Sequence, residues 1–233
     1  MTTGVDDPRD GAVAHATPLA PDDCDVEIGV ATAPRDGYLG VKRAMDVTAC
    51  VLMAPLVAPL LVGCAIAVRL DSPGPVLFRQ KRTGRHGRRF QMYKFRTMVR
   101  NAEELKAELA HLNILPPPDF KIPNDPRITK VGRFLRKTSL DELPQFLNVL
   151  RGDMTLVGPR PTSFSSRTYS TWHTERLEVP PGITGLWQVR GRNNTTFDER
   201  LRLDIDYIRN MSLWLDVKIL LETVSSVVRR SGL

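Results

Sequence analysis

Cysteine is scarce in this sequence. Its 233 residues include only Cys24, Cys50 and Cys64, and none of them stands in a CxxC or Cys/His spacing. A structural zinc site needs four closely spaced ligands, and a disulfide framework needs a larger set of paired cysteines. Neither is therefore indicated. A chain of this length can instead bury the core of one ordinary domain.

Aromatic residues and nucleotide-binding loops are also scarce. Phe, Trp and Tyr make up 6% of the residues, and no stacking platform or nucleic-acid motif is visible, so the sequence does not indicate nucleic acid as a partner. No GxxxxGK[ST] motif occurs, and no GxGxxG follows an expected strand. The familiar phosphate-binding loops are thus excluded.

Basic residues are rare only at the start of the chain. The first 40 residues hold eight acidic side chains against two arginines, a net charge of −6, which leaves +13 for the remainder. Residues 1–40 also lack a hydrophobic period, which predicts a disordered acidic tail rather than a secretory signal. The basic remainder suits an anionic partner, such as a phosphorylated substrate, an acidic membrane surface or nucleic acid.

One long apolar run is present. Val47–Val68 comprises 22 residues without a charge, which as a helix would extend roughly 33 Å, enough to span the hydrocarbon core of a bilayer. A spanning helix, a buried core helix and a re-entrant hairpin are the three interpretations. Pro55 and Pro59 can each bend a helix, and both flanks of the run are basic, so re-entry is favoured over crossing. The basic flanks are Lys42 and Arg43 before the run, and Arg69, Arg79, Lys81, Arg82, Arg85, Arg88 and Arg89 after it. Asp46 is expected at headgroup depth.

The rest of the chain predicts a small hairpin among helices. A β-hairpin is expected from about Val76 to Phe95, and a polar helix in residues 101–112. A helix capped by Asp125 is expected to run to Lys137, and two further helices near Phe197–Asn210 and Leu213–Arg229. The helix ending at Lys137 would be amphipathic, which suits a membrane interface, although a plain surface helix is commoner. Its apolar face is Ile128, Val131 and Leu135, and its basic face is Lys130, Arg133 and Arg136.

Two adjacent carboxylates, Asp141 and Glu142, stand out in this basic body. Ser139 to Glu142 fits a capping box, in which Ser139 caps a helix and Glu142 reaches back to its amide. Pro144 would then be the fifth helical residue and would cost a hydrogen bond, whereas Asp141 as the cap would place Pro144 in the first turn. The alternative to capping is a chemical role.

Three loops combine glycine or proline with basic residues. Arginine grips phosphate oxygens as a planar fork, and glycine lets backbone amides approach an anion. Carboxylates among such cations suit a phosphoryl site that uses Mg²⁺, because this ion takes one or two carboxylates plus phosphate oxygens. The loops are "KFRTM" with Lys94 and Arg96, "GPRP" with Pro159, Arg160 and Pro161, and "GRNN" with Arg192.

Longer motifs extend this pattern. "DSPGPVLFRQKRTG", "YKFRTM", "DPRITKVGRFLRKTSLDELPQFLNVLRGDMTLVGPRP" and "PGITGLWQVRGRN" resemble the bacterial sugar transferases, the monotopic phosphoglycosyl transferases. The resemblance covers about Val41 to Leu233. Larger relatives carry a multi-helix membrane region ahead of this core, so the chain is similar to a small form or to a core excised from a larger one.

The resemblance implies a reaction and its residues. The family transfers a phospho-sugar from a UDP-sugar to a membrane polyprenyl (undecaprenyl) phosphate and releases UMP, at the start of surface glycan assembly. It implies that Asp141 and Glu142 are the catalytic pair, with Asp141 as the nucleophile of a covalent intermediate and the ligand of Mg²⁺. Lys94 and Arg160 would bind phosphate, and Asp204 would lie near the site. Arg96, Pro159, Pro161 and Arg192 complete the expected substrate-binding set.

One departure from the family pattern concerns the membrane bend. Relatives often have Ser-Pro there, whereas Ala58 precedes Pro59 in this chain and Pro55 is additional. The sequence therefore leaves open how the freed carbonyl is satisfied.

The expected fold is α+β and mainly helical, in three parts. Residues 1–40 form the tail, residues 41–70 a re-entrant membrane helix, and residues 71–233 a compact cytosolic catalytic domain with interfacial amphipathic helices. The expected location is the cytoplasmic face of the inner membrane, with a homodimer possible. The alternative function is a membrane-attached protein that binds polyanions, either nucleic acid or anionic lipid.

Overall fold

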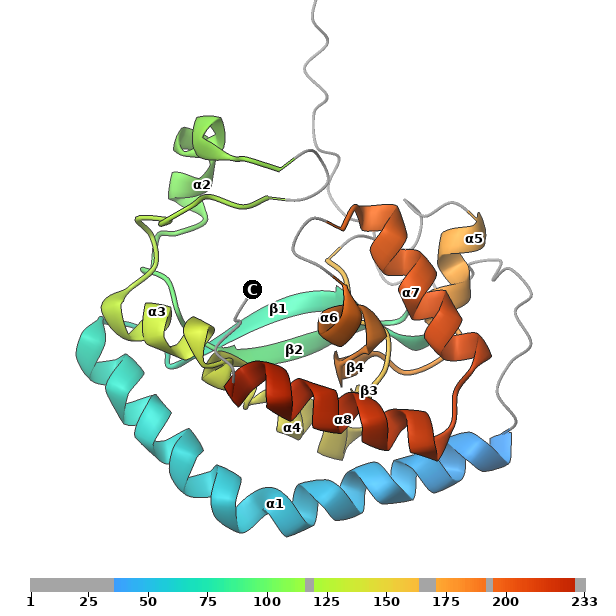
Figure 1. Ribbon diagram of the computed structural model, residues 1–233. Coiled ribbons are helices and arrows are strands. Elements are labelled where there is room, and N and C mark those ends of the chain that lie inside the picture. The colour runs from blue at the N-terminus through green and yellow to red at the C-terminus, as the bar shows by residue number, and fades with distance from the viewer. Residues whose placement is uncertain (1–35, 116–119, 164–170, 192–194, 229–233) are drawn as a thin grey trace, which may run out of the picture.

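The computed structural model describes residues 36–115, 120–163, 171–191 and 195–228. Within these ranges the protein is mainly helical, with two two-stranded sheets and one long apolar helix at the start (Figure 1). Residues 1–35 of the expected tail lie outside the described ranges, whereas residues 36–40 are helical. The elements, with η for a 3₁₀-helix, are α1 (Asp36–Asp71), β1 (Leu77–Thr83), η1 (Arg85–Gly87), β2 (Arg89–Phe95), α2 (Glu104–Glu108), η2 (Ala110–Leu112), α3 (Lys130–Lys137), η3 (Leu140–Glu142), α4 (Gln145–Arg151), β3 (Thr155–Val157), α5 (Thr171–Thr174), η5 (Glu175–Leu177), β4 (Gly182–Thr184), α6 (Leu186–Arg190), α7 (Phe197–Arg209) and α8 (Leu213–Val228).

The predicted hairpin is confirmed. β1 pairs antiparallel with β2, from Leu77 opposite Phe95 to Thr83 opposite Arg89. Side chains alternate between the two faces of such a ribbon, so Phe78 and Gln80 share one face with Lys94 of the opposite strand. All three side chains line the same cavity. The hairpin thus forms one wall of the site described below.

A second, parallel pair of strands was not predicted. β3 and β4 have three residues each, and Thr155 lies opposite Gly182 while Val157 lies opposite Thr184. A Cβ atom at Gly182 would collide with the backbone of Gly158, so only glycine permits this close approach. The pairing brings the "GPRP" and "PGITG" loops together, although they are more than 20 residues apart in the chain.

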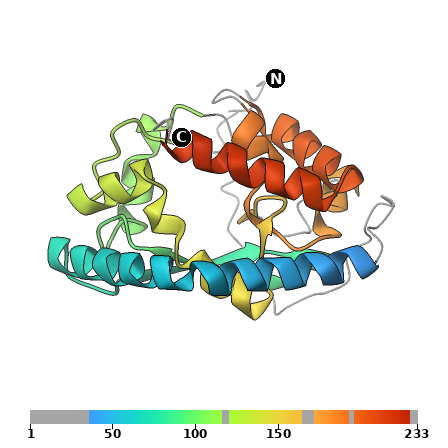
Figure 2. The ribbon, with the colours of Figure 1, turned by 60° about the horizontal axis from the view of Figure 1, so that its bottom comes forward.

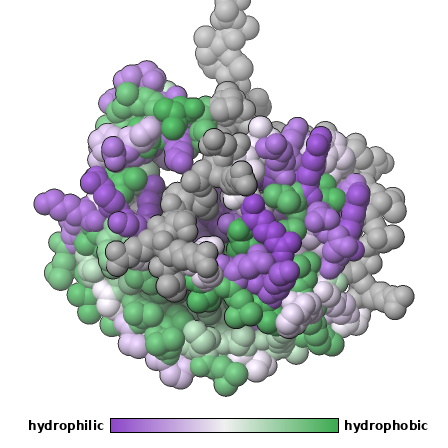
Figure 3. All heavy atoms as spheres, in the orientation of Figure 1, coloured by the Kyte–Doolittle hydropathy of each residue, from purple (hydrophilic) through white to green (hydrophobic). Residues whose placement is uncertain are grey.

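Helix α1 is continuous through Pro55 and Pro59 and bends around the body (Figures 1 and 2). One stripe of the helix is buried: Lys42, Asp46, Cys50, Val57, Cys64 and Val68. The stripe contacts two apolar clusters, one including Cys50, Val149 and Ile219, the other including Cys64, Val68, Phe95 and Leu135. Most of the helix surface is exposed and apolar, and green residues gather along the lower edge of Figure 3, where α1 runs. The helix is long and apolar enough to cross a membrane.

Both ends of α1 are attached to polar groups of the same body. Lys42 forms a buried ion pair with Asp216 of α8, and Arg43 donates hydrogen bonds to the carbonyls of Val149 and Leu150 at the end of α4. At the other end, the carboxylate of Asp71 accepts a hydrogen bond from the amide of Val131. The basic residues before the apolar run are therefore internal anchors, which corrects their interpretation as free flanking charges.

Asp46 is buried in the protein, where its carboxylate accepts a hydrogen bond from the Thr155 hydroxyl. A carboxylate in this position needs such a partner because burial without one is costly. The interaction joins α1 to β3 across 109 residues of sequence, which no local pattern reveals.

The helix before the acidic pair begins later than predicted. α3 is capped by Thr129, whose hydroxyl accepts a hydrogen bond from the amide of Gly132. Asp125 instead forms a buried ion pair with Arg127 at 2.7 Å. The predicted basic face is confirmed, because Lys130, Arg133 and Arg136 are exposed; Arg136 also donates a hydrogen bond from Nε to the Thr97 hydroxyl at 2.8 Å. The polar segment at residues 101–112 divides into α2 and η2.

Neither capping interpretation of the acidic pair is confirmed. Ser139 adopts a left-handed conformation with φ of 56°, and its side chain makes no capping hydrogen bond. Asp141 and Glu142 lie in η3, and Pro144 is the N-cap of α4. A proline before the first turn loses no intrahelical bond. The chain therefore keeps both carboxylates in a tight turn between two helices.

Candidate functional site

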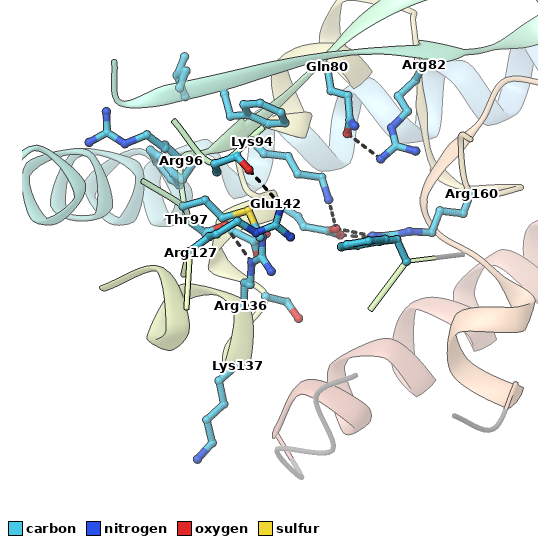
Figure 4. Close-up of a pocket in the computed structure, with 18 of the residues that line it drawn as sticks. Gln80, Arg82, Lys94, Arg96, Thr97, Arg127, Arg136, Lys137, Glu142 and Arg160 are labelled. Atoms are coloured by element: carbon cyan, nitrogen blue, oxygen red, sulfur yellow. Dashed lines mark hydrogen bonds and ion pairs between the residues drawn. The ribbon is translucent and has the colours of Figure 1, made fainter. Parts of the chain in front are cut away.

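A cavity of about 980 Å³ lies between the hairpin, the segment that carries α2, η3, the loop after β3, and the ends of α6 and α8. Its volume suits a ligand of nucleotide-sugar size. Figure 4 shows its cationic interior, with Lys94 and Arg160 converging on Glu142 from different elements. Asp141 and Arg136 also line the cavity. The structure therefore brings together Lys94, Asp141, Glu142 and Arg160, as the sequence predicts.

The two adjacent carboxylates have different surroundings. Glu142 accepts a hydrogen bond from Lys94 Nζ at 2.7 Å and from Arg160 Nη2 at 2.6 Å, both at Oε1. Asp141 lines the same cavity and is only 9% exposed, yet within the described ranges its carboxylate has no hydrogen bond or ion pair. Glu142 is thus held by cations, whereas Asp141 is available to a ligand.

Charge and burial shift the acidity of the pair in opposite directions. Burial alone would raise the pKa of Glu142, but Arg160 and Lys94 hold it well below its usual range. Burial raises the pKa of Asp141, and the neighbouring Lys94 opposes this only in part. In the protein alone, burial therefore outweighs the neighbouring cations and makes the carboxyl group of Asp141 a weaker acid than usual. A further positive charge at this carboxylate would favour its ionised form.

Arg136 is a cavity residue that the sequence did not reveal. Its Nε donates to Thr97, and the guanidinium lines the cavity close enough to interact with Asp141. Burial lowers the pKa of Arg136, whereas the charge of Asp141 raises it. Lys137 lines the same cavity, and nothing in the sequence pattern of α3 distinguishes these two residues from Arg133, which does not line it.

Asp204 lies behind the cavity rather than in it. It is 1% exposed and pairs with Arg176 at 2.6 Å. Arg176 also donates to the carbonyl of Arg160, whose backbone amide hydrogen-bonds to Asp204. Burial raises the pKa of Asp204 to about 6, against the opposing charge of Arg176. The two residues thus clamp the backbone that carries the Arg160 side chain.

Of the remaining predicted residues, Arg96 also lines the cavity. Its guanidinium donates to the carbonyls of Ser72 and Pro75, both at 2.6 Å, and so joins the cavity wall to the segment after α1. Pro159 and Pro161 are buried and shape the Arg160 loop; Pro159 accepts a hydrogen bond from the amide of Gly182 at 2.9 Å. Arg192 lies outside the described residues.

The donor set fits a magnesium ion only together with a substrate. No cluster of three or more His, Cys, Asp or Glu side chains occurs in the part of the chain that the structure describes. Mg²⁺ commonly takes one or two carboxylates, with phosphate oxygens and water completing its shell. Asp141, without a hydrogen bond and facing the cavity, could supply such a carboxylate.

Replacing Arg176 by methionine should test the clamp. The substitution would leave Asp204 buried without its partner and should lower the free energy of unfolding by about 3–5 kcal/mol at pH 7.5. The deficit should shrink as the pH falls, because a carboxyl group with a raised pKa binds a proton more readily in the folded chain. Urea unfolding in detergent from pH 5 to 8 measures both effects. In Arg176→Met/Asp204→Asn, part of the loss should be recovered; an unchanged deficit would contradict the ion-pair explanation.

The comparisons with known proteins agree with this geometry. The family model described as "Bacterial sugar transferase" matches residues 37–230. A relative from Streptococcus agalactiae named galactosyl transferase CpsE is 46% identical over 197 residues, covering 84% of this chain and 44% of the relative. Undecaprenyl-phosphate galactose phosphotransferase of Salmonella typhimurium is 45% identical over 197 residues, covering 82% and 41%.

A shorter relative is matched over more of its length. The UDP-glucose:undecaprenyl-phosphate glucose-1-phosphate transferase of Caulobacter vibrioides is 45% identical over 196 residues, covering 80% of this chain and 69% of the relative. The chain therefore spans less than half of the first two relatives and about two thirds of this one. With a family match over nearly all of its length, the chain belongs to the bacterial sugar transferase family.

Proposed function

We propose that this protein transfers a phospho-sugar from a UDP-sugar to a membrane polyprenyl phosphate and releases UMP. The names of the relatives from Salmonella and Caulobacter, which include undecaprenyl phosphate and UDP-glucose, support the substrate classes. The main structural support is the pair of carboxylates. Asp141 faces a cationic cavity without a hydrogen bond in the described ranges, while Glu142 neutralises Lys94 and Arg160.

The proposed first step is attack by Asp141 on the β-phosphorus of the donor. One carboxylate oxygen forms a bond to phosphorus while the bond to the bridging oxygen breaks, and UMP leaves with that electron pair. The product is an acyl phosphate that carries the sugar. Lys94, Arg136 and Arg160 approach from different sides and would stabilise the negative charge on the phosphate oxygens.

In the second step a phosphate oxygen of the polyprenyl phosphate attacks the same phosphorus. The bond to Asp141 breaks, the carboxylate is restored, and the product is a polyprenyl diphosphate sugar. Bound Mg²⁺, with Asp141 as its protein ligand, would neutralise phosphate charge and favour the ionised carboxylate. Glu142 would keep Lys94 and Arg160 oriented before the donor arrives.

The proposed location is the cytoplasmic face of the membrane, with α1 entering and leaving on the same side. The bend at the prolines and the polar anchors at both ends of α1 support re-entry, because a crossing helix would separate Lys42–Asp216 from Asp71–Val131. The buried ion pair of Lys42 and Asp216 is costly to break.

Cysteine labelling tests this topology. In a variant without native cysteines, single cysteines at the exposed positions Val41 and Gln91 should react with an impermeant maleimide in inside-out vesicles only. Labelling from opposite sides would support a spanning helix. If the bend determines re-entry, replacing both Pro55 and Pro59 by leucine should place the two cysteines on opposite sides of the membrane, so that they are labelled from opposite sides.

Release of UMP tests the proposed reaction. Purified protein in lipid nanodiscs is incubated with Mg²⁺, polyprenyl phosphate and a panel of UDP-sugars, and UMP and lipid-linked sugar are quantified. One sugar should give both products in equal amounts. The competing function, binding of polyanions by a basic surface, predicts salt-sensitive binding of any polyanion and no UMP with any sugar. That function leaves the acidic pair inside the cavity without a role.

A further inference from the structure

The cavity has a different chemical character on the two sides of the acidic pair. Toward the segment of residues 99–128, which carries α2, the lining includes Arg100, Lys106, Arg127 and the ring of Phe120. The lining residues that β4, α6 and α8 themselves supply are uncharged and include Thr184, Gln188 and Ser226. A nucleotide sugar bound with its β-phosphate at Asp141 must place its nucleotide on one side and its sugar on the other. The cationic side suits the nucleotide, which carries the second phosphate.

Phe120 is a partly exposed apolar surface within that cationic side. Its exposed fraction is 37%, and it lines the cavity. Lys106 Nζ lies 5.4 Å from the ring centroid and Arg127 Cζ 5.6 Å from it. Arg127 is itself fixed by Asp125 at 2.7 Å and by the carbonyl of Ala102 at 3.0 Å. The ring of Phe120 thus has an anchored cationic neighbour in Arg127.

The backbone of Lys121, next to Phe120, is hydrogen-bonded to the earlier residues Asn113 and Ile114. The side-chain oxygen of Asn113 accepts hydrogen bonds from the amides of Leu115 and Lys121, at 3.2 and 2.8 Å. The amide of Ile114 donates to the carbonyl of Lys121 at 3.0 Å. These bonds order the backbone beside Phe120 before a ligand binds, which lowers the entropy cost of binding there.

We propose that the ring of Phe120 stacks against the nucleobase of the donor. A planar base offers a π-face to an aromatic side chain irrespective of its hydrogen-bonding edge, and such stacking contributes measurably to nucleotide affinity. The inference rests on the proposed function, since it assumes a nucleotide-sugar donor. It assigns the nucleotide to the side of residues 99–128 and leaves the side of α6 and α8 to the sugar.

Nucleotide affinity measures this contact directly. The dissociation constant for UMP is determined by calorimetry with the full chain in nanodiscs, for the wild type, Phe120→Leu and Phe120→Trp. Phe120→Leu should weaken UMP binding about tenfold, and Phe120→Trp should retain it. The control is Phe134→Leu, the same change at an exposed position of α3 that does not line the cavity, which should leave UMP affinity unchanged.

A modified ligand separates stacking from a general loss of the cavity. 5,6-Dihydrouridine monophosphate keeps the phosphate and the carbonyl groups of UMP but has a non-aromatic ring. The wild type should bind it several-fold more weakly than UMP, and Phe120→Leu should discriminate less between the two ligands. Equal UMP affinity in wild type and Phe120→Leu would overturn the stacking proposal alone.

The remaining outcomes are also decisive. If Phe120→Leu changes the affinity for UDP-sugars but not for UMP, the ring contacts the sugar and the assignment of the two sides is reversed. If the wild type neither binds UMP nor releases it from any UDP-sugar, the proposed function fails together with this inference.

Discussion

Replacing Asp141 by asparagine should abolish turnover in a folded protein. An amide cannot form the acyl phosphate, so the rate of UMP release should fall by at least ~10³-fold. The fold should be retained, because within the described ranges the Asp141 carboxylate makes no hydrogen bond that an amide would lose. Removing a buried carboxyl group whose pKa is raised should not lower the free energy of unfolding at neutral pH.

The covalent intermediate provides the sharper measurement. The wild type is incubated with Mg²⁺ and a UDP-sugar radiolabelled in the sugar, without lipid acceptor. Label should remain on the protein after denaturation, with one UMP released per label, and Asp141→Asn should show neither. Asp206→Asn, at an exposed position on α7 outside this cavity, is the matched control and should behave like the wild type. Label retained by Asp141→Asn would assign the nucleophile to another residue.

Replacing Glu142 by glutamine should separate catalysis from phosphate binding. Glutamine keeps the size of the side chain but no longer neutralises Lys94 and Arg160, which lie 2.7 and 2.6 Å from the carboxylate. Turnover should fall about 10²-fold because the two cations lose their orientation. UMP should bind at least as tightly as to the wild type, because its phosphate no longer competes with Glu142 for these cations.

The pH profile supplies a second measurement for this variant. The charge of Glu142 helps to raise the pKa of Asp141, so its removal should move the acid limb of the rate profile to lower pH. Glu222→Gln on α8, which removes a carboxylate from a partly exposed pair with Arg190 of α6, is the control and should change neither rate nor profile. Weaker UMP binding in Glu142→Gln would show that Glu142 supports the phosphate site instead of competing for it.

Local patterns in the sequence determined several parts of this protein. The alternation of residues in Val76–Phe95 predicts the hairpin, since side chains on a strand alternate between its faces. The uncharged run Val47–Val68 predicts a helix, and the helix continues through both prolines. The family motifs identify Asp141, Glu142, Lys94 and Arg160 as one site. Their meeting in a single cavity agrees with that prediction.

Only the tertiary structure decided what each charged group does. Lys42 and Asp216 are 174 residues apart and form a buried pair, and Arg136 lines the cavity although it belongs to the exposed basic face of α3. The capping box at Ser139 satisfies a local rule, yet Glu142 binds Lys94 and Arg160 from distant segments. Sequence patterns report which face of an element is apolar. The partner of a polar side chain depends on which segments pack against it, and in this protein those segments come together only in the folded chain.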